Sequence, residues 1–139
     1  MTTYVPASRD RAGPRRARTR LAAAAAVVVT VGAGVGLRAV ATGSPAKYGG
    51  DALYTVLIFA LIVLALPRVT ALRAAAGALA VSWAVELLQL TGVPSELSRH
   101  STVARLVLGS TFNAPDLFWY AVGAAFGWLA HTAAVRLSR

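Results

Sequence analysis

The 139-residue sequence contains no cysteine and few charged residues. The absence of cysteine excludes disulfide bonds, thiolate zinc sites and a cysteine nucleophile. Charged residues make up only 14% of the chain, whereas hydrophobic residues make up 57%. A soluble domain of this length needs a polar surface that so few charges cannot supply. The composition therefore predicts one compact unit whose solvent is lipid.

Acidic residues are especially scarce. The chain has five Asp and Glu residues and fourteen Lys and Arg residues, which give a formal net charge of +9. Six of these basic residues are arginines within the first twenty positions. No helix-turn-helix or zinc spacing accompanies them, which argues against nucleic acid as a partner. A hydrophobic run follows directly, so we predict that residues 1–20 are a disordered cytoplasmic tail that binds anionic lipid headgroups.

Four later stretches are predicted to cross the membrane, which requires about 20 helical residues. These spans lie at about residues 21–40, 51–66, 74–90 and 114–135. Residues 41–50 are expected to form a loop, with Asp51 as the N-cap of the second span. A cleaved signal peptide is the alternative for the first span, because Ala39-Val40-Ala41 imitates a cleavage site. The length of the apolar run and Arg38 at its end favour a retained helix.

The segment 95–112 is too interrupted by charge to be a full span, because it contains Glu96, Arg99, His100 and Arg105. We expect a short interfacial or re-entrant helix there, between spans three and four. The predicted fold class is therefore all-α: a polytopic membrane protein of about four transmembrane helices. Residues 21–139 form its single domain.

The distribution of basic residues predicts the topology. The tail and the residues Arg68, Arg73, Arg136 and Arg139 fall on one side, against Lys47, Arg99 and Arg105 on the other. Since the cytoplasmic side of a membrane protein carries the excess of Lys and Arg, both termini are predicted to be cytoplasmic. The bias to Ala, Val, Arg and Gly is typical of a bacterium, and the expected location is a bacterial inner membrane.

Polar residues gather at the predicted extracytoplasmic ends of the spans. Glu86 is the most informative, because an ionised carboxylate inside a span is costly unless it faces the bundle and meets a cation or a proton. We expect Glu86 and Asp116 to pair with an arginine from the same end of the bundle. The candidates are Arg38, Arg99 and Arg105.

This polar group has two interpretations, a structural clamp or a functional site for a headgroup or substrate. In an enzyme, Glu86 or Asp116 would act as general acid or base, with His100 assisting. No metal-ligand set or phosphate-binding loop is recognisable, so neither a metal nor a cofactor is predicted. Small-residue pairs, which let membrane helices approach closely, offer two faces for a homo-oligomer. They are Gly32/Gly36 and Gly123/Gly127.

Several short motifs resemble the domain-of-unknown-function 2809 family of small bacterial membrane proteins. The matching pieces are Gly50-Asp51-Ala52-Leu53-Tyr54, Glu86-Leu87-Leu88-Gln89-Leu90, Arg99, Leu106-Val107-Leu108-Gly109 with Phe112, and Asp116-Leu117 with Tyr120 and Gly123. A looser resemblance is to the VanZ-like proteins, whose order Glu-x-x-Gln, Arg, Asp, Gly matches Glu86, Gln89, Arg99, Asp116 and Gly123. Tyr120 departs from that pattern, because VanZ-like proteins usually have Asn there. VanZ is associated with teicoplanin resistance, so this resemblance implies a role in the cell envelope.

Three functions follow from these patterns. The first is an envelope protein that binds membrane lipids, or a lipid-linked precursor, beneath the 95–112 segment. The second is a membrane enzyme that acts on such a lipid, and the third is a structural or assembly subunit. The predicted ligand-binding residues are Arg38, Asp51, Glu86, Gln89, Arg99, Arg105, Asp116 and Tyr120.

Overall fold

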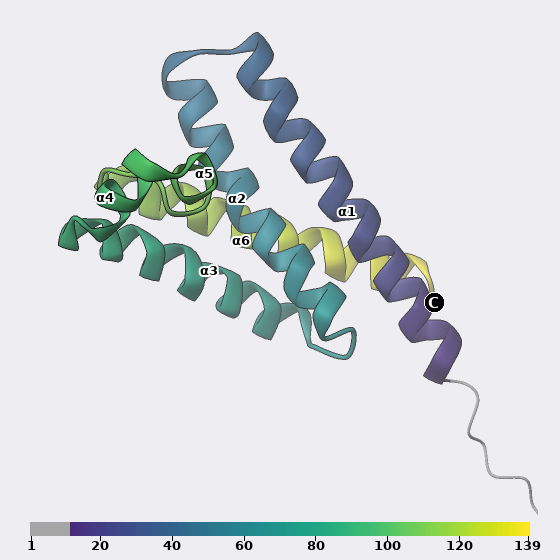
Figure 1. Ribbon diagram of the computed structural model, residues 1–139. Helices are drawn as coiled ribbons and strands as arrows, with labels where there is room; N and C mark the ends of the chain where they lie inside the picture. Colours follow the sequence, from purple (N-terminus) through teal and green to yellow (C-terminus); the bar gives the residue numbers. More distant parts are fainter. Residues whose placement is uncertain (1–11) are drawn as a thin grey trace, which may run out of the picture.

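The computed structural model describes residues 12–139, and all regular structure in this range is helical. Its elements are α1 (Ala12–Val40), α2 (Gly43–Ala65), α3 (Ala71–Leu88), a 3₁₀ turn (Gln89–Thr91), α4 (Val93–His100), α5 (Thr102–Leu108) and α6 (Ala114–Leu137). The four long helices form a bundle, and α4 and α5 lie together at one end of it (Figure 1). The predicted all-α class is confirmed.

Within residues 12–139, three helical stretches are long and apolar enough to cross a membrane: Gly13–Val40, Gly43–Ala65 and Ala71–Thr91. The fourth long helix, α6, has 24 residues and runs beside α2 and α3. Large apolar side chains are exposed on all four long helices, for example Val28, Leu61, Leu72 and Phe126. A protein in water buries most such side chains, so this distribution indicates a protein surrounded by lipid.

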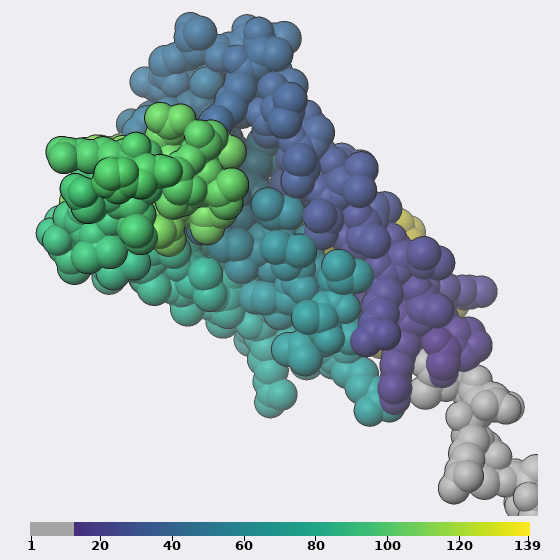
Figure 2. All heavy atoms as spheres, viewed as in Figure 1, coloured from purple at the N-terminus to yellow at the C-terminus, as the bar shows by residue number. Residues whose placement is uncertain are grey.

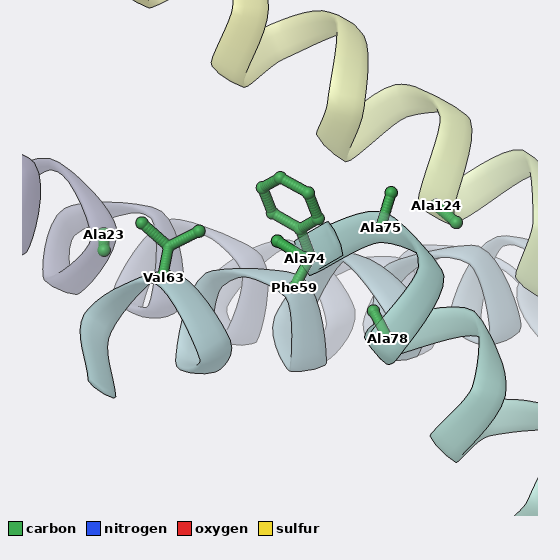
Figure 3. Close-up of a cluster of buried hydrophobic side chains, with 7 residues drawn as sticks. All are labelled: Ala23, Phe59, Val63, Ala74, Ala75, Ala78 and Ala124. Carbon is green, nitrogen blue, oxygen red and sulfur yellow. The ribbon is translucent and has the colours of Figure 1, made fainter. Parts of the chain in front are cut away.

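The interior of the bundle is made of small side chains around α2, which contacts α1, α3 and α6. Phe59 and Val63 of α2 lie in a cluster whose other members are alanines (Figure 3). These are Ala23, Ala74, Ala75, Ala78 and Ala124. Helix association in lipid depends on close packing rather than on the hydrophobic effect, and alanine permits that approach.

Two glycines of α6 bring it against α2. At Gly123 a Cβ atom would overlap the backbone carbonyl of Ala52, and at Gly127 it would lie 2.9 Å from the Phe59 ring. The predicted Gly123/Gly127 face is therefore covered by α2 of the same chain and is not free to bind a second copy. The other predicted face is open, because a Cβ atom at Gly32 or Gly36 would meet nothing within 4 Å.

The first helix begins earlier than predicted, at Ala12. The tail expected to be disordered over residues 1–20 is thus helical from Ala12 onward, while residues 1–11 lie outside the described range. Arginine and alanine are strong helix formers, which explains the extension. Pro14 lies in the first turn, where its missing N–H leaves no hydrogen bond unmade.

The second helix begins at Gly43, so residues 43–50 are helical rather than a loop. Asp51 is not its N-cap, because that position is held by Thr42 and Asp51 lies inside the helix. One of the glycines that suggested a loop, Gly49, lies against α1 instead. A Cβ atom at Gly49 would come within 2.6 Å of the Leu37 side chain of α1.

The segment between α3 and α6 contains two short helices, not the single one predicted. Gly92 has a φ of 79° and separates the 3₁₀ turn from α4. Ser101 is extended and separates α4 from α5, and its hydroxyl accepts a hydrogen bond from Ala104 N at 3.2 Å. Helix α6 starts at Ala114, as predicted, and continues to Leu137.

Candidate functional site

Polar residues of three helices lie at one end of the bundle, here called the polar end. It comprises Lys47 and Asp51 near the start of α2, Glu86 near the end of α3, and Asp116 and Tyr120 at the start of α6. Helices α2 and α6 run in the same direction, because Lys47 binds Asp116 near their starts and Phe59 packs on His131 further along.

Glu86 is fully buried, with 0% of its surface exposed. Its Oε1 accepts a hydrogen bond from the backbone N–H of Asn113 at 2.7 Å, and its Oε2 accepts one from the hydroxyl of Tyr120 at 2.9 Å. Within residues 12–139 no ion pair involves Glu86, so the predicted pairing with an arginine is wrong. The carboxylate lies at the start of α6, where backbone N–H groups and the helix dipole favour negative charge without a cation.

Asp116 is also buried, and its partner is a lysine. Lys47 Nζ donates to Oδ1 and Oδ2 of Asp116 at 2.8 and 2.7 Å, and Asn113 Nδ2 donates to Oδ1 at 2.6 Å. Lys47 Nζ also lies 3.8 Å from Asp51 Oδ2, which is buried and has no hydrogen-bond partner among the described residues. The predicted pairing of Asp116 with an arginine is therefore wrong, and Lys47 joins α2 to α6.

The sequence did contain a signal for Lys47. Thr42 followed by Pro45 resembles a helix start, with a capping residue and a proline in the first turn. A helix that starts after Thr42 places Lys47 and Asp51 four residues apart on one face, which is the spacing of an i, i+4 ion pair.

The segment 107–109 is attached to the bundle through three successive carbonyl groups. Tyr54 Oη donates to Val107 O at 2.9 Å, and Gln89 Nε2 donates to Leu108 O at 2.6 Å. Ser98 Oγ donates to Gly109 O at 2.8 Å. The donors come from α2, the 3₁₀ turn and α4, so they hold this segment across the polar end. Tyr54 and Ser98 were not predicted as site residues, because nothing in the sequence reveals contacts to backbone carbonyls.

A cavity of about 1020 Å³ lies between α1, the first half of α2 and the segment 105–113. Figure 2 shows its opening between the green spheres of that segment and the blue spheres of α1. Arg38 and Arg105 line it, and neither takes part in an ion pair or side-chain hydrogen bond in the described part of the chain. The predicted residues Asp51, Glu86, Gln89, Asp116 and Tyr120 line it as well.

Arg99 is the one predicted binding residue that does not line the cavity. It lies on α4, where its Nη1 is 3.5 Å from Glu96 Oε2, and His100 Nε2 is 3.3 Å from Glu96 Oε1. The Arg99 and His100 side chains are 73% and 76% exposed. Spacings of three and four residues bring both side chains to Glu96 on the helix surface, away from Glu86 and Asp116.

The arrangement suits an anion better than a metal. No group of three His, Cys, Asp or Glu side chains that could hold a metal ion occurs among residues 12–139. The carboxylates of Glu86 and Asp116 already accept hydrogen bonds from the protein, whereas the guanidinium groups of Arg38 and Arg105 are available at the cavity wall. Guanidinium groups are well suited to bind phosphate and carboxylate.

The fold and the polar end together define a helical membrane protein with buried carboxylates beneath a pair of short helices. The sequence model of a family described as "Protein of unknown function (DUF2809)" matches residues 40–124. The chain belongs to this family, and the match includes every residue of the polar end. No curated protein and no solved structure matches the chain.

Proposed function

We propose that the protein is a cell-envelope protein of a bacterial inner membrane and binds an anionic headgroup in the cavity. The headgroup would belong to a membrane lipid or to a lipid-linked precursor. The observation that carries the proposal is the pair of arginines, Arg38 on α1 and Arg105 on α5, which line one cavity without an acidic partner in the described chain.

The remaining polar residues position the site in this proposal. Lys47 is engaged by Asp116, so its charge is largely neutralised. Glu86 accepts from Asn113, and Gln89 donates to Leu108, which fixes the segment that follows Arg105. The acids and Gln89 would therefore shape the wall of the site while the two arginines contact the anion.

An envelope role is supported by two independent considerations. With both termini in the cytoplasm, as the distribution of basic residues predicts, the polar end faces the extracytoplasmic side. The order Glu86, Gln89, Asp116 and Gly123 also resembles the VanZ-like proteins. Arg99, the remaining member of that order, lies outside the cavity and is not part of the proposed site.

Native mass spectrometry of the protein released from its own membrane tests the proposal. Wild type should carry an anionic lipid or lipid-linked precursor, and Arg38→Gln and Arg105→Gln should each lose most of it. Arg99→Gln is the matched control, because it removes an arginine from the neighbouring helix α4 but not from the cavity, and should retain the lipid. Equal retention by all three variants would refute the headgroup site.

The second candidate function is structural, and the saturation of Glu86 by Asn113 and Tyr120 favours it. In that case the polar end would only fasten the segment 105–113 to the bundle, and no lipid would co-purify specifically. The geometry does not favour the enzymatic alternative, because His100 lies outside the cavity, away from Glu86 and Asp116.

A further inference from the structure

The cavity has two regions of different chemistry. Toward the polar end its walls carry charges, whereas toward the middle of α1 the lining residues carry none. We call this second region the apolar arm, and it is lined by Thr30, Val31, Gly34, Val35, Leu53 and Leu57. We propose that the ligand is a lipid whose acyl chain lies in the apolar arm and enters sideways, between α1 and α5. This inference rests on the proposed function and specifies its ligand class.

The α1 wall of the arm presents one continuous apolar face. Val31, Gly34 and Val35 follow one another at spacings of three and one, which places them on the same side of the helix as Arg38. Thr30 adds no free donor, because its hydroxyl donates to Ala26 O at 2.6 Å within the same helix. An ion or a sugar would find no hydrogen-bond donor among these side chains, whereas a hydrocarbon chain needs none.

The dimensions of the cavity suit an amphiphile. Arg38 and Thr30 are eight residues apart on α1, which corresponds to about 12 Å along the helix axis. Lys47 and Leu57 are ten residues apart on α2, or about 15 Å. The cavity volume of about 1020 Å³ lies at the upper limit of pockets that hold drug-sized ligands, about 300–1,000 Å³. A phosphate group bound at Arg38 would leave most of that volume empty.

The cavity also has an apolar side entrance. Val31 and Val35 on α1 are 48% and 65% exposed, and Leu106 and Val107 on α5 are 53% and 50% exposed. Figure 2 shows a gap between these two helices. An opening bordered by exposed apolar side chains would let an acyl chain enter from the surrounding bilayer.

Gly34 offers a direct test of the arm. A Cβ atom at Gly34 would meet nothing within 4 Å, and the residue lines the cavity, so Gly34→Leu would place apolar bulk at the wall of the arm. Gly32→Leu is the matched control. It lies two residues away on the same helix, also has no neighbour within 4 Å of a Cβ atom, and does not line the cavity.

Two ligands with the same phosphate group separate a lipid from a soluble anion. Dioleoyl phosphatidic acid binding to delipidated protein in detergent would be measured by native mass spectrometry, and glycerol 3-phosphate binding by equilibrium dialysis. We expect Gly34→Leu to weaken phosphatidic acid binding at least tenfold and to leave glycerol 3-phosphate binding unchanged. Gly32→Leu should change neither.

The outcomes distinguish this inference from the proposed function. Arg38→Gln and Arg105→Gln should weaken both ligands if the headgroup site exists, and unchanged binding of both would refute the proposed function itself. If those variants weaken binding but Gly34→Leu binds phosphatidic acid like wild type, the headgroup site stands and the apolar arm is refuted. The acyl-chain assignment would also be refuted if Gly34→Leu lost phosphatidic acid and glycerol 3-phosphate to the same extent. It would likewise be refuted if the wild-type protein bound the two ligands with equal affinity.

Discussion

Replacement of Glu86 tests whether the buried carboxylate acts through its charge or through its two hydrogen bonds. The carboxylate accepts from Asn113 N and Tyr120 Oη at 2.7 and 2.9 Å, and no ion pair involves it in the described chain. In Glu86→Gln, the side-chain oxygen can still accept from Asn113. The new amide can donate to the Tyr120 hydroxyl, because a hydroxyl both donates and accepts. Both contacts survive as neutral hydrogen bonds.

General hydrogen-bond energies, applied to these two contacts, give the expected magnitudes. Hydrogen bonds to a charged group contribute about 1.5–3 kcal/mol, and neutral ones about 0.5–1.5 kcal/mol. Weakening both bonds is partly offset by removal of a buried charge, so Glu86→Gln should lower the free energy of unfolding by about 1 kcal/mol or less. Tyr120→Phe removes one donor from the carboxylate and should cost about 1.5–3 kcal/mol. Glu86→Leu leaves two buried donors unsatisfied, which amounts to about 2–6 kcal/mol.

Unfolding by dodecyl sulfate in mixed micelles, followed by far-ultraviolet circular dichroism, measures these differences. The expected order of stability is wild type, Glu86→Gln, Tyr120→Phe, then Glu86→Leu. The reasoning would be refuted if Glu86→Gln were as unstable as Glu86→Leu. That result would mean that the charge of Glu86 stabilises the bundle through a cation or a shared proton.

Three further predictions concern packing, the ion pair and topology. Gly123→Ala should lower the free energy of unfolding by about 1–3 kcal/mol in the same titration, because its Cβ atom would overlap a backbone carbonyl of α2. Lys47→Met should cost about 1.5–3 kcal/mol in that assay, because Asp116 loses the donor to both its oxygens. Since the chain has no cysteine, single cysteines report topology. A membrane-impermeant maleimide should label Ser101→Cys in spheroplasts but label Ser138→Cys only after lysis.

Matched variants control these measurements. Gly36→Ala adds a Cβ atom to open space and should be neutral or stabilising by up to about 1 kcal/mol. A destabilisation equal to that of Gly123→Ala would contradict the packing argument. Lys47→Arg keeps a cation near Asp116 and should be more stable than Lys47→Met. Labelling of Ser138→Cys before lysis would contradict the proposed orientation.

Much of the fold could be predicted because its signals are local. The apolar runs and the breakers that separate them, such as Pro67 and Gly92, mark three long helices and the start of α6 after Asn113. The start of α2 could not be located in this way. A glycine such as Gly49 is compatible with a loop or with close helix packing, and only the structure shows that it lies against the side chain of Leu37.

The members of the site were more predictable than its contacts. The position of a residue along a membrane-spanning helix gives its depth in the membrane. This depth predicted that Glu86, Gln89, Asp116 and Tyr120 lie at the same end of the bundle. The partners depend on the rotation of each helix about its axis and on the path of the segment 105–113. An error of one residue in a helix changes the direction of a side chain by about 100°. The backbone of Asn113 was therefore missed, and Lys47 was missed because the start of α2 was expected to be a loop.

The sequence alone determined that this chain is an all-helical protein with few charges, because hydropathy and helix signals act over short stretches. It also determined which kinds of polar group lie at the polar end. Only the tertiary structure decided that Glu86 is held by neutral donors, that Lys47 binds Asp116, and that Arg38 and Arg105 meet at a cavity that Arg99 does not reach. Those pairings join residues from different helices, and ångström-scale packing between helices determines them.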